Sequence, residues 1–488
     1  MRAGRYEVYG HDGRRWLIDC VRDSRAAALM RCEELAEDAR TGFTLLQVVD
    51  AGRAHGREMV IHEQAVHRKQ ASRPRMQSVQ DASYCEQLVD YYALHARLVV
   101  GRLLRPFLDD ERVTALELLH DYTRLRRLMR DDRLYPLALN HVASLQARLA
   151  DRPAAERRAE IDRAVQQIIE RARGSHAYAG LSRALAEGGL PAARTALPAG
   201  ATPDQARLQL SAAIARYLRD HGDWTDKLQA LLDLVAGADG SEAGCALIDE
   251  AVAEILQSAD AVEALLGHAP NLADRLVARI QLARGALHTT DDRPKVGRPG
   301  AGSGAGCGAG PGADARQLAQ RLSRAFAHRE AVWRQAPATL MRQVEGVLHA
   351  TRPLANHPTQ EAEAFERVVA ALHGVGGLAG GPETADAVTR RARLVYGDAF
   401  ENLPPRPTVE KVAGLLSPRS AQIGYLLALA ASPFGRKYTQ VMVAVLTETL
   451  KGLTSREALL ADGGDPREIQ QMVRELTDRL TLLDPQRG

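Results

Sequence analysis

The histidines near residue 60 are the first side chains whose types and spacing suggest metal chemistry. His62 and Glu63 are followed by His67, one residue later than in the zinc motif HExxH. On a helix, histidines four positions apart lie about 40° from each other, whereas five positions place them about 140° apart, so that they diverge. In the alternative interpretation, a metal site, His55 supplies a third ligand. The spacing favours a strand end that runs into a polar linker, and we predict no metal site.

A glycine-rich motif at residues 374–379 matches the pattern GxGxxA. The dinucleotide fingerprint needs a strand before the glycines and a helix directly after them. Here a helical pattern precedes the motif, and Gly380-Gly381-Pro382 delays the next helix. The motif therefore predicts a loop between two helices. The sequence also lacks the P-loop pattern, the GxSxG nucleophile elbow and the kinase signatures. We expect no cofactor.

Single reactive side chains are present, but their surroundings do not favour catalysis. Cys85 stands between Tyr84 and Glu86, with no adjacent positive charge to lower its pKa. His95 and His120 fall within helical patterns, where a lone histidine is usually packed. The acidic residues 109–111 suit a helix N-terminus, because that end carries partial positive charge. We nominate no catalytic residue.

Arginine-rich segments offer two candidate contacts for an anion or a nucleic acid. The first is a basic linker at residues 66–82. The second is a predicted helix whose arginines share the face opposite its leucines, and Arg390–Arg393 form a similar cluster. A solvated linker and a solvated helix face explain the same residues. The candidate contact residues are Arg68, Lys69, Arg73, Arg75, Arg126, Arg130 and Arg133.

The last helix carries an apolar stripe. Asp465-Pro466-Arg467-Glu468 is a capping box with proline at the first helical position, a combination that marks a helix start. The stripe is explained either by a bundle core or by docking into the groove of a partner protein. Its residues are Ile469, Met472, Val473, Leu476 and Leu480.

Only residues 1–65 show the alternation of a β-sheet. Tyr6 and Val8 alternate with polar neighbours, a turn follows at residues 10–13, and the alternation resumes at Trp16. A helical pattern covers Arg25 to Arg40, and strand patterns follow at residues 43–49 and 58–62. This order predicts a small ββαβ module with one further strand.

The remainder of the chain predicts helices. We divide it into a helical domain at residues 83–290, a flexible Gly/Ala/Pro-rich tether at 291–314 and a C-terminal helical domain at 315–488. Glycine loses much backbone entropy on folding, and the tether has almost no apolar side chain to offset that loss. Thr202-Pro203-Asp204-Gln205 marks one helix start. Short connections favour antiparallel neighbours. The predicted fold class is mostly α, antiparallel helical bundles with a small N-terminal α/β module.

Composition excludes some classes of protein. The chain has 488 residues, a net charge of +3 and interspersed charges of both signs, which argues against specialised nucleic-acid binding. Its five cysteines are scattered, without CxxC, which suits reduced thiols. No apolar run is long enough to span a bilayer, and the N-terminus lacks an apolar signal core. We expect a cytoplasmic location and no membrane partner.

The hypothesis that follows is a non-enzymatic, cytoplasmic regulatory or scaffold protein whose partners are other proteins. Two alternatives stay open. The first is an enzyme or ligand-binding protein with a pocket between helices, built from residues that no linear motif reveals. The second is a nucleic-acid-binding regulator that uses the arginine-rich surfaces, although nucleic acid is the less expected partner.

Overall fold

The computed structural model divides the chain into two units, Met1–Arg75 and Met76–Gly488, and each is described by itself. The boundary falls inside the linker predicted at residues 66–82. The residues that the structure describes are 5–11, 16–37, 43, 45–51, 59–65, 79–80, 82–174, 178–236, 242–287, 313–328, 332–374, 377–396, 405–417, 419–452 and 466–483.

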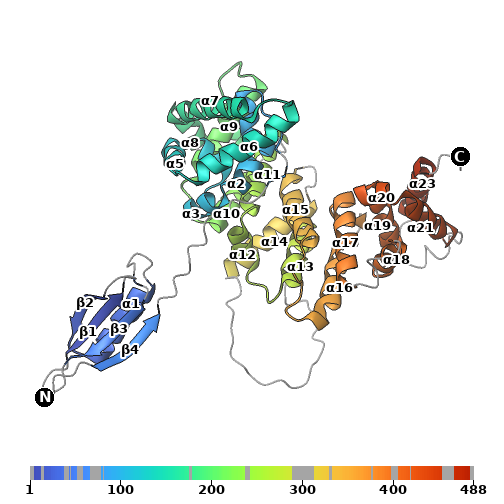
Figure 1. Ribbon diagram of the computed structural model, residues 1–488. Helices are drawn as coiled ribbons and strands as arrows, with labels where there is room; N and C mark the ends of the chain where they lie inside the picture. Colours follow the sequence, from blue (N-terminus) through green and yellow to red (C-terminus); the bar gives the residue numbers. More distant parts are fainter. Residues whose placement is uncertain are drawn as a thin grey trace. The chain divides into compact units, whose positions relative to one another are not determined.

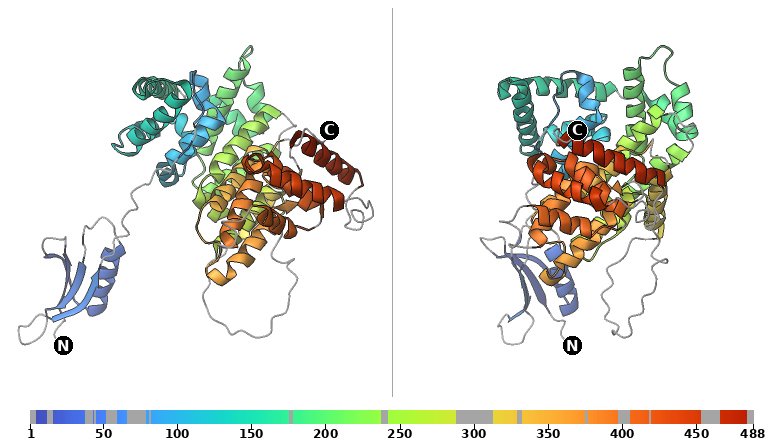
Figure 2. Two further views of the ribbon diagram at one scale, coloured as in Figure 1. Left: turned by 45° about the vertical axis from the view of Figure 1, so that its right-hand side comes forward. Right: turned by 90° about the vertical axis from the view of Figure 1, so that its right-hand side faces the viewer.

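Four antiparallel strands build the sheet of the first unit: β1 (Tyr6–His11), β2 (Trp16–Arg22), β3 (Leu45–Asp50) and β4 (Met59–Ala65). Their order in the sheet is β2-β1-β3-β4. Helix α1 (Arg25–Glu37) lies along one face of this sheet (Figures 1 and 2). The predicted module, including its further strand, is confirmed.

The face of the sheet under α1 forms a small apolar core. Because successive side chains of a strand point to opposite faces, one alternating set faces the helix. Gly10 belongs to this set, and a Cβ at this position would collide with the ring of Phe43, so glycine permits that ring to pack over β1. The buried core residues are Val8, Ala28, Cys32, Leu35, Leu46 and Val48.

The opposite face of the sheet carries exposed apolar side chains. Tyr9 pairs with Ile18 in the register of β1 and β2, and His11 pairs with Trp16. Tyr9 and His11 alternate with Val8 along β1, so they and their partners in β2 lie on the face away from α1. Trp16 and Ile18 are 40% and 52% exposed. This face therefore carries accessible apolar side chains within the first unit, next to polar ones such as Glu7 and Gln47.

The second unit is helical. Its helices arise where apolar residues recur with the helical period and where Ser, Thr, Asp or Asn caps the first turn. Their bounds are α2 (Leu94–Leu103), α3 (Arg105–Glu111), α4 (Ala115–Leu119), α5 (Tyr122–Met129), α6 (Leu134–Ala150), α7 (Ala154–Arg173), α8 (Ala179–Thr195), α9 (Pro203–Leu218), α10 (Trp224–Ala236), α11 (Glu242–Leu256), α12 (Ala259–Leu266), α13 (Leu272–Ala283), α14 (Ala313–His328), α15 (Gln335–His349), α16 (Glu361–Leu372), α17 (Gly381–Val395), α18 (Arg406–Gly414), α19 (Arg419–Ala431), α20 (Pro433–Lys437), α21 (Thr439–Gly452) and α23 (Pro466–Leu483).

Capping residues start several of these helices where the sequence predicts it. The Thr202 hydroxyl accepts a hydrogen bond from the Gln205 amide at 3.3 Å, and the Gln205 side chain accepts one from the Thr202 amide in return. The predicted capping box of α9 is thus present. Helix α23 begins at Pro466, directly after the predicted cap. Local sequence therefore determines these helix starts.

Helices from both sides of the predicted tether share apolar cores. Leu228 and Ile248, which precede the tract, belong to one buried cluster with Leu322 and Trp333, which follow it. A second cluster joins α13 to helices α15 to α23. In Figure 1, α14 lies beside α12 and α13, and α15 lies beside α11, all of which precede the tract. Most of the tract, 288–312, lies outside the described residues, and its flexibility stays a prediction, as does separate folding of residues 83–290 and 315–488.

A buried carboxylate strengthens this packing across the tract. Asp249 of α11 is 2% exposed and lies at the N-terminus of α15. One of its oxygens accepts hydrogen bonds from the amides of Arg334 and Gln335 at 2.9 and 2.7 Å, and the other accepts one from Ala336 at 2.9 Å. These amides have no partner within α15 itself. Asp249 therefore acts as a tertiary cap for α15.

The structure confirms the predicted fold class, mostly α with a small N-terminal α/β module. Neighbouring helices such as α6 and α7 pack against each other across the short connection Asp151–Pro153. Within the described ranges, every helix falls short of the length and apolar character that crossing a bilayer demands.

Candidate functional site

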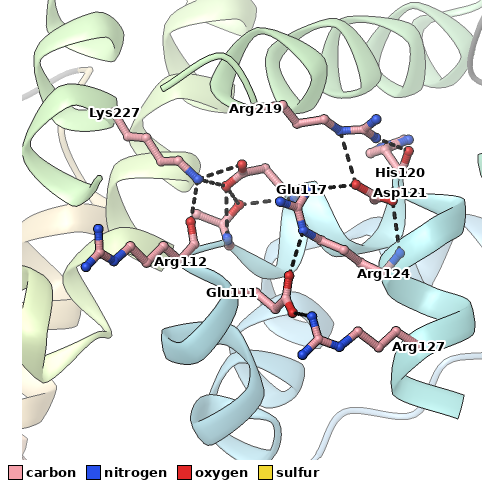
Figure 3. A network of polar contacts seen from close by, with 10 residues as sticks. Glu111, Arg112, Glu117, His120, Asp121, Arg124, Arg127, Arg219 and Lys227 are labelled. Carbon is pink, nitrogen blue, oxygen red and sulfur yellow. Dashed lines mark hydrogen bonds and ion pairs between the residues drawn. The ribbon is translucent and has the colours of Figure 1, made fainter. Parts of the chain in front are cut away.

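The first part of the helical unit contains a network of buried ion pairs (Figure 3). At its centre, Lys227 of α10 donates to both carboxylate oxygens of Glu117, at 2.7 and 2.9 Å, and to the Arg112 carbonyl at 2.6 Å. Lys227 is 2% exposed and Glu117 is fully buried. Glu117 also accepts from the Thr114 amide at 2.9 Å, in the capping box of α4. The pair joins α4 to α10.

A second buried group joins α2 to α11. Arg97 is fully buried and contacts Glu250 and Glu254, with its Nη1 2.8 Å from Glu254 Oε1. The other oxygen of Glu254 accepts from the Leu116 amide at 2.7 Å. Burial raises the pKa of Glu254, since desolvation disfavours its charge. Residues more than 100 positions apart are thereby held together.

His120 lies at the edge of this network. Its ring is 5.2 Å from the ring of Tyr92, and its carbonyl accepts from Arg219. Burial, together with the nearby charges of Arg97 and Arg219, lowers the pKa of His120 to about 3. Its Nε2 has no hydrogen-bond partner within the described part of the chain. The imidazole is therefore neutral at physiological pH.

This network is better explained by stability than by catalysis. Lys227, Glu117 and Arg97 are at most 2% exposed, so a substrate in water does not reach them. Their charges are also neutralised by one another at hydrogen-bond distance. Buried pairs of this kind hold helices in one arrangement, because breaking them leaves a charge in an apolar interior.

An apolar cavity of about 130 Å³ lies nearby, between α2, α4, α5, α6 and α7. It is lined by aliphatic side chains and by a few polar ones. The residues are Ala82, Ser83, Cys85, Tyr91, Ala96, Val99, Val100, Leu103, Leu104, Leu118, Leu119, Leu125, Leu128, Tyr135, Ala138, Leu139, Val142, Gln146, Ile161, Val165 and Ile168. Protein interiors are close-packed, so a void of this size is a feature that needs an explanation.

Three of the polar lining groups converge on one guanidinium. Arg157 of α7 donates to the Gln146 side chain at 2.9 and 2.6 Å, to the Cys85 carbonyl, and to the Tyr91 hydroxyl at 3.3 Å. Arg157 is only 3% exposed. Its guanidinium also lies 4.2 Å from the centre of the Tyr84 ring. Arg157 thus places a buried positive charge beside the apolar cavity.

A polar cavity of about 310 Å³ lies on the other side of Arg157. Its lining shares Tyr91 with the apolar cavity. Glu160 connects two of its arginines, accepting from Arg157 at 2.7 Å and from Arg152 at 3.1 Å. The hydrogen bond from Arg157 lowers the pKa of Glu160, so this carboxyl is charged. The residues of the lining are Tyr84, Glu86, Leu88, Tyr91, Arg152, Arg157, Glu160, Arg163, Ala164 and Gln167.

The titratable groups of the apolar cavity are neutral. Burial raises the pKa of the Cys85 thiol and that of the Tyr91 hydroxyl. Burial also raises the pKa of Tyr135, whose hydroxyl donates to Asp162 at 3.1 Å. A neutral thiol is a poor nucleophile, and these phenols do not exchange protons near pH 7. The cavity is thus suited to binding.

The predicted arginine contacts fall in different places. Arg126 lies in α5, Arg130 is the C-cap of α5 and Arg133 is the N-cap of α6; all three are exposed. Because α5 ends at Met129, the single helical face expected for them is wrong. The linker residues Arg68, Lys69, Arg73 and Arg75 lie outside the described residues. Contact with an anion or a nucleic acid through these residues stays a prediction.

Two neighbours of these arginines belong to ion pairs. Arg124 contacts Asp121 and Glu111 at 2.8 and 3.3 Å, and Arg127 contacts Glu111. In the later cluster, Arg391 is buried and donates to the Ala350 carbonyl at 2.6 Å. These arginines have structural partners and are not a free basic surface.

The structure describes part of the histidine pattern that resembles HExxH and part of the glycine-rich motif at residues 374–379. His62 lies in β4, where it pairs with Val48 in the register, while His55 and His67 lie outside the described residues. Nowhere in the described ranges do three or more His, Cys, Asp or Glu residues gather as metal ligands. The glycine motif lies between α16 and α17, where we predicted a loop between two helices, and its described residues include two short paired strands, β5 (His373–Gly374) and β6 (Gly377–Leu378).

The stripe of the last helix contributes to a core. Leu476 is fully buried and Leu480 is 7% exposed, and both belong to the C-terminal cluster. Helix α23 contacts α19 and α21. These two leucines are therefore covered by this chain, as the bundle interpretation predicts. The side chains of Ile469, Met472 and Val473 lie outside the described residues, and a docking role for them stays a prediction.

Comparison with known proteins gives no relative for this chain: no family model, no curated protein and no solved structure matches it. We therefore infer the function from the geometry of the described residues.

Proposed function

We propose that this chain is a non-enzymatic, cytoplasmic regulatory protein whose helical unit binds a small apolar ligand. The observation that supports the proposal is the cavity of about 130 Å³ between α2 and α4–α7. An apolar cavity of about 150 Å³ in another protein stays dry and binds benzene. By this measure the cavity suits a group of about six carbon atoms.

The energetic cost of the cavity supports a ligand. An unfilled apolar cavity leaves its lining without the dispersion contacts of a packed core, and this loss destabilises the folded chain. A ligand that fills the cavity restores the missing dispersion contacts. Binding therefore stabilises the helical unit, and such a change is a means of regulation.

The neutral lining supports binding over chemistry. Cys85, Tyr91 and Tyr135 are held in their uncharged forms, and none of them is a general acid or base near neutral pH. Ligand sites of this composition, apolar with a few polar groups that orient the ligand, are common between helices. These features support the alternative of a ligand-binding protein with a pocket between helices.

Calorimetric titration with 1-heptanol tests the proposal. We expect saturable binding to the wild-type protein and loss of that binding in Ala138→Leu, because leucine places three more carbons in the cavity. Ala155→Leu is the matched control, since Ala155 is exposed on α7 and lines neither cavity. Circular dichroism establishes that both variants fold. The proposal is wrong if the wild type shows no saturable binding, or if Ala138→Leu binds as the wild type does.

A second candidate function, docking of another protein, is supported by the exposed face of the sheet. Trp16, Ile18 and Val60 are 40%, 52% and 49% exposed, and aromatic and aliphatic side chains are typical of interface centres. Purification of the intact protein and of a chain lacking residues 1–65 tests this function. We expect a co-purifying protein that is lost on the deletion, and an unchanged set of partners would contradict it.

A further inference from the structure

The polar cavity beside the apolar one indicates what the head of the ligand is. We infer that the ligand is a carboxylic acid with an apolar tail of about six carbons, a length that follows from the benzene-sized cavity. Its tail fills the apolar cavity, and its carboxylate contacts the arginines of the polar cavity. This inference rests on the proposed function, because it assigns the second half of the same ligand.

The charges of the polar cavity favour an anion. Its lining contains three arginines and two glutamates, which leaves one positive charge in excess. Glu160 balances Arg157 and Arg152 together, so one negative group is shared between two cations. Arg163 brings a further guanidinium to the same lining. A carboxylate is the geometric complement of a guanidinium, because both are planar and form paired hydrogen bonds.

The two cavities meet at a weak contact. Tyr91 lines both, and its hydroxyl is 3.3 Å from Arg157 Nη2, longer than an ordinary hydrogen bond between nitrogen and oxygen. The other contacts of Arg157 are short, such as the one to Gln146 at 2.6 Å. Tyr91 is therefore the residue at which a ligand that occupies both cavities would pass from one to the other.

The volumes agree with this division of the ligand. The apolar cavity is the smaller, at about 130 Å³, and the polar one measures about 310 Å³. The apolar tail then fills the apolar cavity, while the carboxylate enters the larger cavity, which has a polar lining. A charged head left inside the apolar cavity would be unfavourable, since an unpaired buried charge loses its hydration.

Titration with heptanoate and with 1-heptanol, which share the chain length, tests the inference. We expect the wild type to bind heptanoate about tenfold more tightly, because one charge-assisted hydrogen bond contributes about that factor. Increasing salt is expected to reduce the affinity for heptanoate and to leave that for heptanol unchanged.

The double variant Arg152→Gln/Arg163→Gln removes the two arginines of the lining other than the buried Arg157. We expect it to bind heptanoate and heptanol with equal affinity, and to bind heptanol as the wild type does. Arg148→Gln is the control, because Arg148 is exposed on α6 and lines neither cavity. We expect it to retain the tenfold preference.

Equal affinities of the wild type for the two compounds would overturn the carboxylate assignment and leave the apolar site intact. The assignment also fails if the double variant keeps the preference for heptanoate. Absence of heptanol binding in the wild type contradicts the proposed function itself, so the two failures are distinguishable. Unfolding curves of each variant, measured without ligand, separate lost binding from lost structure.

Discussion

The buried pair of Glu117 and Lys227 gives the sharpest test of how the helical unit is held together. Replacing Glu117 with glutamine removes the negative charge and leaves the amine of Lys227, only 2% exposed, without a counterion. The Arg112 carbonyl, 2.6 Å from Nζ, stays as an acceptor. Breaking one side of a buried pair typically costs about 3–5 kcal/mol of folding free energy.

The pKa of the lysine sets an upper bound on this cost. Burial lowers the pKa of Lys227. In the Glu117→Gln variant, the amine can avoid an unpaired buried charge by releasing its proton. The ordinary pKa of a lysine amine, about 10.4, lies about 3.4 units above pH 7. Because each pKa unit corresponds to about 1.36 kcal/mol, removing the proton at pH 7 costs about 4.6 kcal/mol. We therefore expect Glu117→Gln to reduce the free energy of unfolding by about 3–4.6 kcal/mol at pH 7.

A neutral lysine in the folded variant also predicts a pH dependence. The unfolded chain binds one more proton than the folded variant, so stability rises as pH increases. Relative to the wild type, the variant should recover up to about 1.4 kcal/mol per pH unit between pH 7 and 9. Urea unfolding followed by far-ultraviolet circular dichroism measures both quantities.

Two further variants complete this test. Glu117→Gln/Lys227→Met replaces both members of the pair, and we expect it to lie within about 1 kcal/mol of the wild type, because no charge stays buried. Glu410→Gln breaks the exposed pair with Arg406 and should cost less than about 0.5 kcal/mol. A loss of less than about 1 kcal/mol in the free energy of unfolding of Glu117→Gln would refute this reasoning, since breaking one side of a buried pair costs more than that.

Three more predictions concern stability. Asp249→Ala leaves three amides at the start of α15 without their acceptor, and we expect a loss of about 2–3 kcal/mol in urea unfolding; a loss within about 0.5 kcal/mol would contradict the tertiary cap. His120 has a folded-state pKa of about 3, because burial and the charges of Arg97 and Arg219 lower it from 6.5. The unfolded chain therefore binds the proton first, and stability falls as pH drops from about 6.5 towards 3, by about 2 kcal/mol at pH 5. His120→Phe should lack this part of the decline, and parallel pH profiles would exclude the assignment. Glu361 accepts hydrogen bonds from the Leu354 and Ala355 amides and from Arg391. These hydrogen bonds outweigh desolvation and lower the pKa of Glu361. Glu361→Gln should therefore unfold more easily than the wild type at pH 7 but approach the stability of the wild type near pH 3.

Local signals in the sequence located much of the fold. The alternation around Tyr6 and Val8, the turn that follows and the helical period after Arg25 predicted the N-terminal module. The capping box at Thr202 and the one before Pro466 marked helix starts correctly. Such signals work because capping and amphipathic periodicity depend on residues at most a few positions apart.

The candidate site could not be found in this way. Its cavity is lined mostly by aliphatic residues between Ala82 and Ile168, and such residues are typical of an ordinary helix core. The only available signal was Arg157, an arginine among apolar positions of α7, and its partners Cys85 and Gln146 are distant in the sequence. A void depends on how side chains fill space, which a linear pattern does not contain.

By itself the sequence determined that this chain is helical after a small β-rich module, and it determined where several helices begin. The tertiary structure alone decided that Lys227 meets Glu117, that Asp249 caps α15 beyond the glycine tract and that the linings of two cavities share Tyr91. The physical reason is the range of the interactions. Helix and strand formation follow from neighbouring residues, whereas the environment of a charge or a cavity is set by segments that only folding brings together.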